Sequence, residues 1–213
     1  MSAHLFSVES DSERIEHFDD GIFLLRGFAN STELMAQVRI VCASAPLRQM
    51  TVPGGKQMSV AMSNCGPLGW TSDSAGYRYS ATDPRTGNSW PAMPDAFMSL
   101  ATRAATAAGF RNFKPDACLI NEYQSKAKLS LHQDRDECDF TQPIVSVSMG
   151  ADAVFQFGGL RRNDAKKSLL LQDGDVLVWG GPARLRYHGV GPPLADCRTG
   201  AALRVNLTLR NAA

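Results

Sequence analysis

The second half of the chain is divided into short apolar segments, and this pattern constrains the fold more than any other feature of the sequence. Glycine-rich turns such as Gly158-Gly159 and Gly180-Gly181-Pro182 separate the segments, and no helical pattern lies between them. Short strands without intervening helices predict an antiparallel double-sheet jelly roll. The expected strands are Ala117–Tyr123, Leu129–His132, Ile144–Met149, Val154–Phe157, Ser168–Leu171, Asp175–Trp179, Leu185–His188 and Leu203–Leu209.

The first half of the chain carries a short strand and two helical patterns. Ile22–Leu25 is an apolar run between glycines, which is typical of a buried strand. Asn30, with Glu33 three residues later, predicts the start of a helix. Pro94 in a first turn and Gly109 at the end bracket a second helix. The expected fold class is therefore mostly β, within the α+β group, with N-terminal helices.

Residues 47–92 lack a core periodicity, apart from a possible short strand at Met58–Met62. We expect mainly loops here, and four large aromatic side chains concentrate in the segment: Trp70, Tyr77, Tyr79 and Trp90. The simpler interpretation is that they pin a long loop to the core. The alternative is a lid that stacks on a flat ligand, since long ordered loops often bind ligands.

Charge is distributed unevenly along a chain of 213 residues whose net charge is +1. Residues 1–20 hold one arginine and six acids, a net −5, which leaves +6 for residues 21–213. We therefore expect an acidic extension over residues 1–20 and one domain over 21–213, with residues 21–113 helical and loop-rich and 114–213 forming the β core. The acidic start and the lack of a long apolar run predict a cytoplasmic protein without membrane contact. Five widely spaced cysteines indicate reduced thiols.

One segment of the β half, Leu129–Asp136, brings a histidine and an aspartate two residues apart, His132 and Asp134. Residues i and i+2 of an extended backbone project from one face, so the two side chains could converge on a metal ion. A third ligand must come from elsewhere in the chain. If His188 supplies it, the set is a two-histidine, one-carboxylate triad, which favours non-haem iron and oxygen chemistry.

The last expected strand alternates strictly between apolar and polar residues, and Arg204, Asn206, Thr208 and Arg210 share its polar face. One interpretation is an edge strand with a solvated face. The other is that the two arginines, about 20 Å apart along the strand, reach inward and bracket a small dianion, because arginine suits carboxylates. Asn121 and Tyr123 likewise share one face of their strand, where they either pack or bind the same ligand.

Four polar motifs occur in a fixed order: Asn121-x-Tyr123, His132-x-Asp134, His188 and Arg204-x-Asn206-x-x-x-Arg210. With them the chain resembles the AlkB family of Fe(II)- and 2-oxoglutarate-dependent dealkylating dioxygenases, above all its bacterial DNA-repair members. The likeness covers most of the chain beyond residues 1–20, including Pro53-Gly54-Gly55, Leu68-Gly69-Trp70, Phe155-Gln156-Phe157-Gly158-Gly159 and Val178-Trp179-Gly180-Gly181. It implies a single dioxygenase domain, with a double-stranded β-helix (jelly-roll) core and a nucleotide-recognition lid.

The resemblance also implies a role for individual residues. Fe(II) would be bound by His132, Asp134 and His188. The co-substrate 2-oxoglutarate would be held by Asn121, Tyr123, Arg204, Asn206 and Arg210. The damaged base would face Asp136, as a further catalytic residue, and Arg162, under a lid of Trp70, Tyr77, Arg78 and Tyr79. Asp136 keeps the inward face of Asp134 by its spacing, whereas the role of Arg162 rests on the resemblance alone.

The reaction that the family implies is oxidative demethylation of N-alkylated bases of the 1-methyladenine and 3-methylcytosine type. It uses Fe(II), O2 and 2-oxoglutarate and releases succinate, CO2 and formaldehyde. The expected partner is alkylated single- or double-stranded DNA, with RNA as an extension, and we expect a monomer. Two rival hypotheses are a 2-oxoglutarate-dependent hydroxylase of a protein or small molecule, and a nucleic-acid binder whose iron site is vestigial.

Overall fold

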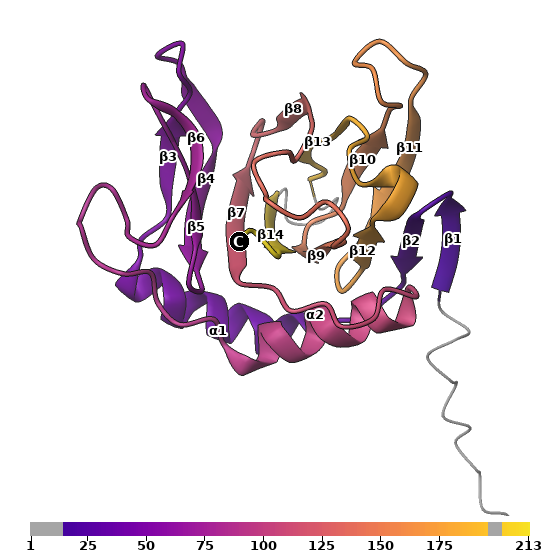
Figure 1. The fold of residues 1–213 in the computed structure, drawn as a ribbon, viewed down its shortest axis with the longest axis horizontal. Coiled ribbons are helices and arrows are strands. Elements are labelled where there is room, and N and C mark those ends of the chain that lie inside the picture. Colours follow the sequence, from indigo (N-terminus) through magenta and orange to yellow (C-terminus); the bar gives the residue numbers. More distant parts are fainter. Residues whose placement is uncertain (1–14, 196–201) are drawn as a thin grey trace, which may run out of the picture.

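A computed structural model describes residues 15–195 and 202–213 and arranges them in layers (Figure 1). Two helices lie side by side against a large sheet with the order β1-β2-β12-β9-β14-β7-β4-β3. A smaller sheet, β11-β10-β13-β8, faces it, and β5 pairs with β6 in a separate hairpin. The strands of both main sheets pair antiparallel, which confirms the predicted jelly roll.

The elements have the following bounds. The helices are α1 (Ser31–Ser44) and α2 (Asp95–Ala107), with one 3-10 turn at Gly181–Ala183. The strands of the first half are β1 (Ile15–Asp19), β2 (Ile22–Leu25), β3 (Arg48–Thr51), β4 (Gln57–Cys65), β5 (Gly69–Asp73) and β6 (Gly76–Ser80). Those of the second half are β7 (Ala117–Gln124), β8 (Leu129–His132), β9 (Ile144–Gly150), β10 (Ala153–Phe157), β11 (Lys167–Leu171), β12 (Val176–Trp179), β13 (His188–Pro193) and β14 (Leu203–Arg210).

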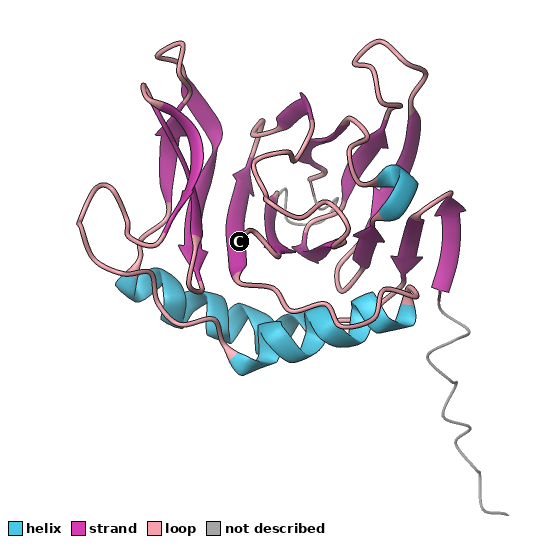
Figure 2. Cartoon of the chain, viewed as in Figure 1, coloured by secondary structure: helices cyan, strands magenta, loops and turns pink. Residues whose placement is uncertain are grey.

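Both helices begin where the sequence predicts, and α2 also ends where it predicts. The Asn30 side chain accepts a hydrogen bond from the backbone N–H of Glu33 at 3.3 Å, which caps α1. Pro94 precedes α2, and Gly109 follows it with a φ of +88°, a left-handed conformation that glycine adopts at little cost. Figure 2 shows these two helices together on one side of the strands.

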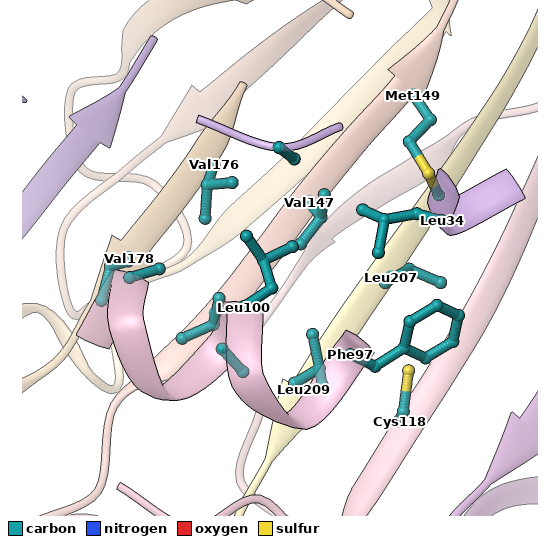
Figure 3. Packing of buried hydrophobic residues seen from close by; sticks show 14 of the residues in the cluster. Leu34, Phe97, Leu100, Cys118, Val147, Met149, Val176, Val178, Leu207 and Leu209 are labelled. Carbon is teal, nitrogen blue, oxygen red and sulfur yellow. The ribbon is translucent and has the colours of Figure 1, made fainter. Parts of the chain in front are cut away.

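The helices pack on one face of the large sheet. Phe97 and Leu100 of α2 lie against Val147, Leu207 and Leu209, as Figure 3 shows. A second apolar cluster fills the space between the two sheets, with Ile144, Phe155, Phe157, Leu177 and Trp179 among its buried members. Strands β9 and β12 therefore have both faces covered. This explains why β12, Val176–Trp179, reads as an apolar run rather than as an alternating pattern.

The prediction of loops over residues 47–92 was wrong for much of the segment. Strand β4 extends to Cys65 and pairs with β7 in the large sheet, well beyond the expected Met58–Met62. A hairpin of β5 and β6 follows, and only the part after Ser80 lacks regular structure up to α2. The strand pattern is hidden because β4 buries polar side chains, among them Ser63 and Asn64, which hydrogen-bond to backbone atoms.

The strand expected at Leu185–His188 was also misplaced, because β13 begins at His188 and runs on to Pro193. The residues before His188 include a turn, in which the Arg186 N–H donates to the carbonyl of Ala183 at 3.0 Å. Strand β13 contains glycine and proline, which normally indicate a turn. Here Gly189 has a different role, because a Cβ at this position would lie only 2.9 Å from the Leu129 carbonyl oxygen. Glycine thus permits close approach of β13 to β8.

Part of the stretch expected as an acidic extension is a strand, since Ile15–Asp19 forms β1 and pairs with β2 at the edge of the large sheet. Strand β4, from the part expected to be helical and loop-rich, pairs directly with β7 of the part expected to form the β core. The start of the acidic extension and Cys197 lie outside the described residues. Within those residues, Cys42, Cys65, Cys118 and Cys138 are free thiols, and no helix has the length and apolar character needed to cross a bilayer.

Asp19 ties β1 to the opposite sheet, so we predict that Asp19→Asn lowers stability. Its carboxylate lies 3.0 Å from Lys167 Nζ and 2.9 Å from Arg186 Nη1, and these two partners lower the pKa of Asp19 to about 2. A lowered folded-state pKa stabilises the protein above the unfolded value and loses that effect as the pH falls from about 4 towards 2. After allowance for solvent screening we expect a loss of about 1 kcal/mol at pH 7. Urea unfolding of both proteins between pH 7 and pH 3 should show the difference shrinking below about pH 4.

Candidate active site

A cavity of about 640 Å³ opens between the two sheets, and the polar residues singled out in the sequence converge on it. Strands β7 and β14 of the large sheet form its floor, and β8 and β13 of the small sheet form the opposite wall. The β5–β6 hairpin adds Trp70 and Tyr77 at one side. The lining includes Asn121, Tyr123, His132, Asp134, Asp136, Arg162, His188, Arg204, Asn206 and Arg210.

His132, Asp134 and His188 form a cluster whose potential ligand atoms all lie within 4.8 Å of one another. His132 ends β8 and pairs in register with His188, which begins β13, so the two imidazoles come from neighbouring strands. Asp134 follows in the extended segment after β8. Its oxygens lie 3.6 Å from His132 Nε2 and 3.7 Å from His188 Nε2. The predicted convergence of these three side chains is therefore present.

Backbone carbonyls orient both imidazole rings. The Nδ1 atom of His132 lies 2.8 Å from the Ser130 carbonyl oxygen, and that of His188 lies 3.0 Å from the Arg186 carbonyl oxygen. A proton on Nδ1 that donates to each carbonyl leaves the Nε2 lone pair directed at the cluster centre, the usual arrangement of metal-bound histidine.

The site favours unprotonated ligand groups at neutral pH. Desolvation in the cavity, and then the neighbouring His188, lower the pKa of His132 to about 4. Desolvation alone would raise the pKa of Asp134, but the Arg210 guanidinium and the two imidazoles hold it well below its usual range. Two imidazole nitrogens and one carboxylate fit a divalent cation such as Fe(II), and the lowered pKa values of His132 and Asp134 favour binding because metal ligands must be deprotonated.

Strand β14 is a central strand between β7 and β9, so the alternative of a solvated edge strand was wrong. Its polar face turns into the cavity, where Arg204, Asn206 and Arg210 are buried. Arg210 donates to Asp134 Oδ2 at 2.7 Å and therefore lies next to the cluster. Arg204 lies at the other end of the strand, with its guanidinium 5.0 Å from the Tyr123 ring centroid.

Several buried polar atoms around Arg204 have no hydrogen-bond partner among the described residues. They are Nε and Nη1 of Arg204 and Oδ1 of Asn121. Unsatisfied buried polar groups are costly and rare, so these atoms require a partner such as water or a bound ligand. Two free N–H donors on a buried guanidinium suit a carboxylate. These residues therefore fit 2-oxoglutarate, a dianion with a carboxylate at each end.

The β5–β6 hairpin brings two of its aromatic side chains to the cavity. The Trp70 and Tyr77 rings stack with centroids 5.6 Å apart and an interplanar angle of 14°. Trp70 Nε1 donates to Asp136 Oδ2 at 2.9 Å, so the hairpin also contacts the segment that follows the cluster. Asp136 is exposed at the cavity rim, as its spacing from Asp134 predicts.

Two residues expected in the lid lie elsewhere. Arg78 forms a partly exposed ion pair with Asp73, 2.7 Å away, and does not line the cavity. The Tyr79 hydroxyl donates to Glu137 at 2.7 Å, beneath the cavity wall. Alternation along β6 explains why Arg78 points away from Tyr77. Arg162 does line the cavity, 5.3 Å from the Tyr187 ring centroid.

The polar residues that support the cavity floor were not predicted from the sequence. Ser146 and Ser148 of β9 accept hydrogen bonds from Asn206 Nδ2 at 2.8 Å and from Arg204 Nη2 at 2.9 Å. The sequence feature that could have predicted Ser146 and Ser148 is their spacing, two small polar residues two positions apart in an otherwise apolar strand. The buried ion pair of Glu137 and Arg184, with 3.0 Å between Oε2 and Nη2, left no such signal.

Comparison with known proteins agrees with this geometry. Residues 21–210 match the 2OG-Fe(II) oxygenase superfamily. The chain is 56% identical over 201 residues to the alpha-ketoglutarate-dependent dioxygenase AlkB of Escherichia coli (strain K12), covering 90% of each protein. It is 54% identical to the protein of the same name from Salmonella typhimurium, covering 91% of each. The solved structure of OsALKBH1 superposes with a TM-score of 0.82 at 26% identity, covering 92% of this chain and 99% of the other.

The fold and the site define an Fe(II)- and 2-oxoglutarate-dependent dioxygenase: a jelly roll carrying a two-histidine, one-carboxylate cluster and a buried arginine. Within that class, the chain belongs to the AlkB family.

Proposed function

We propose that the protein is an oxidative dealkylase that repairs N-methylated bases of the 1-methyladenine and 3-methylcytosine type in DNA. The observation that carries this proposal is the meeting of three features on one cavity. These are a metal-binding cluster, unsatisfied donors suited to a dianion, and a stacked aromatic pair beside an exposed carboxylate. The metal-binding cluster would supply the oxidation, and the aromatic pair and carboxylate beside it suit a flat, positively charged group. A methylated base has both of these properties, which supports it as the substrate.

In this proposal His132, Asp134 and His188 hold Fe(II). Arg204 binds the carboxylate of 2-oxoglutarate that lies far from the metal, supported by Asn121, Tyr123 and Asn206. Arg210, which contacts Asp134, binds the carboxylate of 2-oxoglutarate that lies nearer the metal-binding cluster. When bound, Fe(II) and 2-oxoglutarate supply the chemistry that inserts one oxygen atom of O2 into the N-methyl C–H bond, with succinate and CO2 as products. The C–N bond of the hydroxymethyl group then breaks, formaldehyde and a proton leave, and the ring nitrogen keeps the bonding electron pair, so the neutral base is restored.

The chain's own side chains would select the base. A methyl group on a pairing nitrogen prevents normal base pairing, so extruding such a base costs less than extruding an intact one. Trp70 and Tyr77 offer ring faces for stacking, a contribution of about 1–3 kcal/mol per base that does not depend on sequence. Asp136 places a negative charge at the rim, which favours a cationic methylated base, and Arg162 contacts the nucleotide from the opposite wall.

The direct test incubates the protein with Fe(II), ascorbate, 2-oxoglutarate and an oligonucleotide carrying one 1-methyladenine. Formaldehyde should form and adenine should be restored, and neither should occur with an unmethylated oligonucleotide. Succinate formation that does not depend on the oligonucleotide, with no formaldehyde, would instead support a hydroxylase of another substrate. No succinate at all, together with tight oligonucleotide binding, would support a vestigial iron site.

Asp136→Asn should remove base selectivity while leaving iron binding intact. Asparagine can still accept the hydrogen bond from Trp70 but lacks the charge, and a charge-assisted bond exceeds a neutral one by about tenfold in affinity. We therefore expect the ratio of kcat/KM for cationic 1-methyladenine over neutral N6-methyladenine to fall by about tenfold. Parallel assays on the two oligonucleotides check this. An unchanged ratio would remove Asp136 from base recognition.

We further infer that the enzyme acts as a cytoplasmic monomer and accepts single- or double-stranded DNA, with RNA as a second substrate. Competition between matched methylated oligonucleotides of each kind would rank these substrates. Light scattering during size-exclusion chromatography would test the oligomeric state, with the mass of one chain as the expected result.

A further inference from the structure

We infer that Glu137 is a positioning residue. It joins the β5–β6 hairpin to Asp134 and so positions the Trp70 ring relative to the metal-binding cluster. The inference rests on the proposed function, because it assigns the hairpin to the base and Asp134 to the metal. Glu137 does not line the cavity and would not touch substrate. It would act through two neighbours, Tyr79 and Arg210.

The carboxylate of Glu137 is shared among three side chains. The Tyr79 hydroxyl donates to Oε1 at 2.7 Å, and Arg210 Nε lies 3.3 Å from the same atom. Arg184 Nη2 donates to Oε2 at 3.0 Å. Arg210 in turn donates to Asp134 Oδ2, so a continuous chain of contacts runs from the hairpin to the cluster.

The two arginines and two carboxylates of this network are almost fully buried. Side-chain exposure is 2% for Glu137, 3% for Arg184, 7% for Arg210 and 9% for Asp134. Two positive and two negative charges balance one another. A buried charge that loses its partner is strongly destabilising, so the four groups constrain one another's positions. Arg184 also donates to the Asp134 backbone carbonyl at 2.8 Å, which fixes the main chain beside the cluster.

One cross-strand pair of the hairpin contacts the segment that follows the cluster. Trp70 and Tyr79 are direct partners in the β5–β6 register. They bond to Asp136 and Glu137, which are consecutive in sequence. One bond lies at the exposed rim and the other in the buried network, so the pair is joined to this segment at two depths. Loss of the buried bond alone should leave the pair joined to this segment only at the rim.

The test compares Tyr79→Phe, Glu137→Gln and the double variant in the full-length chain. Glu16→Gln is the matched control, since Glu16 forms an exposed ion pair with Arg26 far from the cavity. The readouts are the Kd for a fluorescent methylated oligonucleotide, the KM for the co-substrate, kcat, and amide hydrogen exchange over residues 69–80 and 133–137. A role limited to overall stability would change the unfolding temperature without moving Kd or KM.

Tyr79→Phe should weaken oligonucleotide binding by about tenfold, the loss of one hydrogen bond to a buried charge, and leave the KM for the co-substrate unchanged. Glu137→Gln should raise both constants, because Arg210 also loses one of its two charged partners and keeps only Asp134. The double variant should bind the oligonucleotide no more weakly than Glu137→Gln, since Tyr79 acts through Glu137. Exchange over both segments should rise in all three variants and not in the control.

Two results would overturn the inference. One is a double variant whose increase in oligonucleotide Kd equals the product of the two single increases, which would mean that Tyr79 and Glu137 act independently. The other is unchanged binding constants and unchanged exchange in folded variants. The outcome is separable from the proposed function. If the wild-type chain neither binds nor demethylates the oligonucleotide, the function fails, while hydrogen exchange still reports whether Glu137 couples the hairpin to the segment around Asp134.

Discussion

Asp134→Ala should abolish iron binding and, with it, formaldehyde production. The substitution removes one of three metal ligands and leaves the charge of Arg210 without its nearest partner, 2.7 Å away, beside two imidazoles. Loss of a residue that merely supports a ligand costs about 10- to 100-fold in metal affinity, so loss of the ligand itself should exceed about 100-fold. Titration of the metal-free protein with Mn(II) or Fe(II) measures the affinity independently of turnover.

Asp134→Asn provides a second variant if the alanine protein does not fold, because asparagine can still accept the hydrogen bond from Arg210. Asp20→Ala, which removes an exposed carboxylate in the β1–β2 turn, is the control and should behave as wild type. Unchanged metal affinity in a folded Asp134 variant would exclude this cluster as the iron site.

Arg204→Met should have opposite effects on co-substrate binding and on stability. The buried guanidinium has two nitrogen atoms without partners among the described residues, and desolvation lowers the pKa of Arg204. Truncating one partner of a buried charge pair costs about 2–5 kcal/mol, so the KM for the co-substrate should rise by about 30-fold or more. The ligand-free protein should become more stable, by about 1 kcal/mol, because an unpaired buried charge is replaced by an apolar side chain.

Thermal unfolding with and without 2-oxoglutarate and Mn(II) measures both effects. The unfolding temperature of the wild-type protein should rise as 2-oxoglutarate is added, because the ligand binds the folded state. The unfolding temperature of Arg204→Met should be higher than that of the wild type without 2-oxoglutarate and should rise little when it is added. An equal gain in the two proteins would mean that the co-substrate carboxylate binds elsewhere.

Much of the site could be predicted because alternation along a strand fixes which side chains share a face. His132 with Asp134, Asn121 with Tyr123, and the polar face of β14 all follow from this rule, and all of them reach the same cavity. Helix starts and ends also follow from local chemistry, as at Asn30 and Gly109. These features depend on neighbours in sequence.

The features that were missed depend on partners far apart in sequence. Strand β13 contains glycines and prolines that normally indicate a turn, and only its pairing with β8 and β10 makes it a strand. The resemblance placed Tyr79 in the lid with Tyr77, but its hydroxyl donates to a buried carboxylate 58 positions away. Alternation predicts the face of a side chain and not the partner that it meets there.

The most direct test of base demethylation follows one methyl group. An oligonucleotide carrying a single 1-methyladenine with a carbon-13-labelled methyl group is incubated with the protein, Fe(II), O2 and 2-oxoglutarate. Labelled formaldehyde, restored adenine and oligonucleotide-dependent succinate should appear in equal amounts. Intact methylated oligonucleotide, or succinate formed without labelled formaldehyde, would contradict the conclusion that this cavity demethylates nucleic-acid bases.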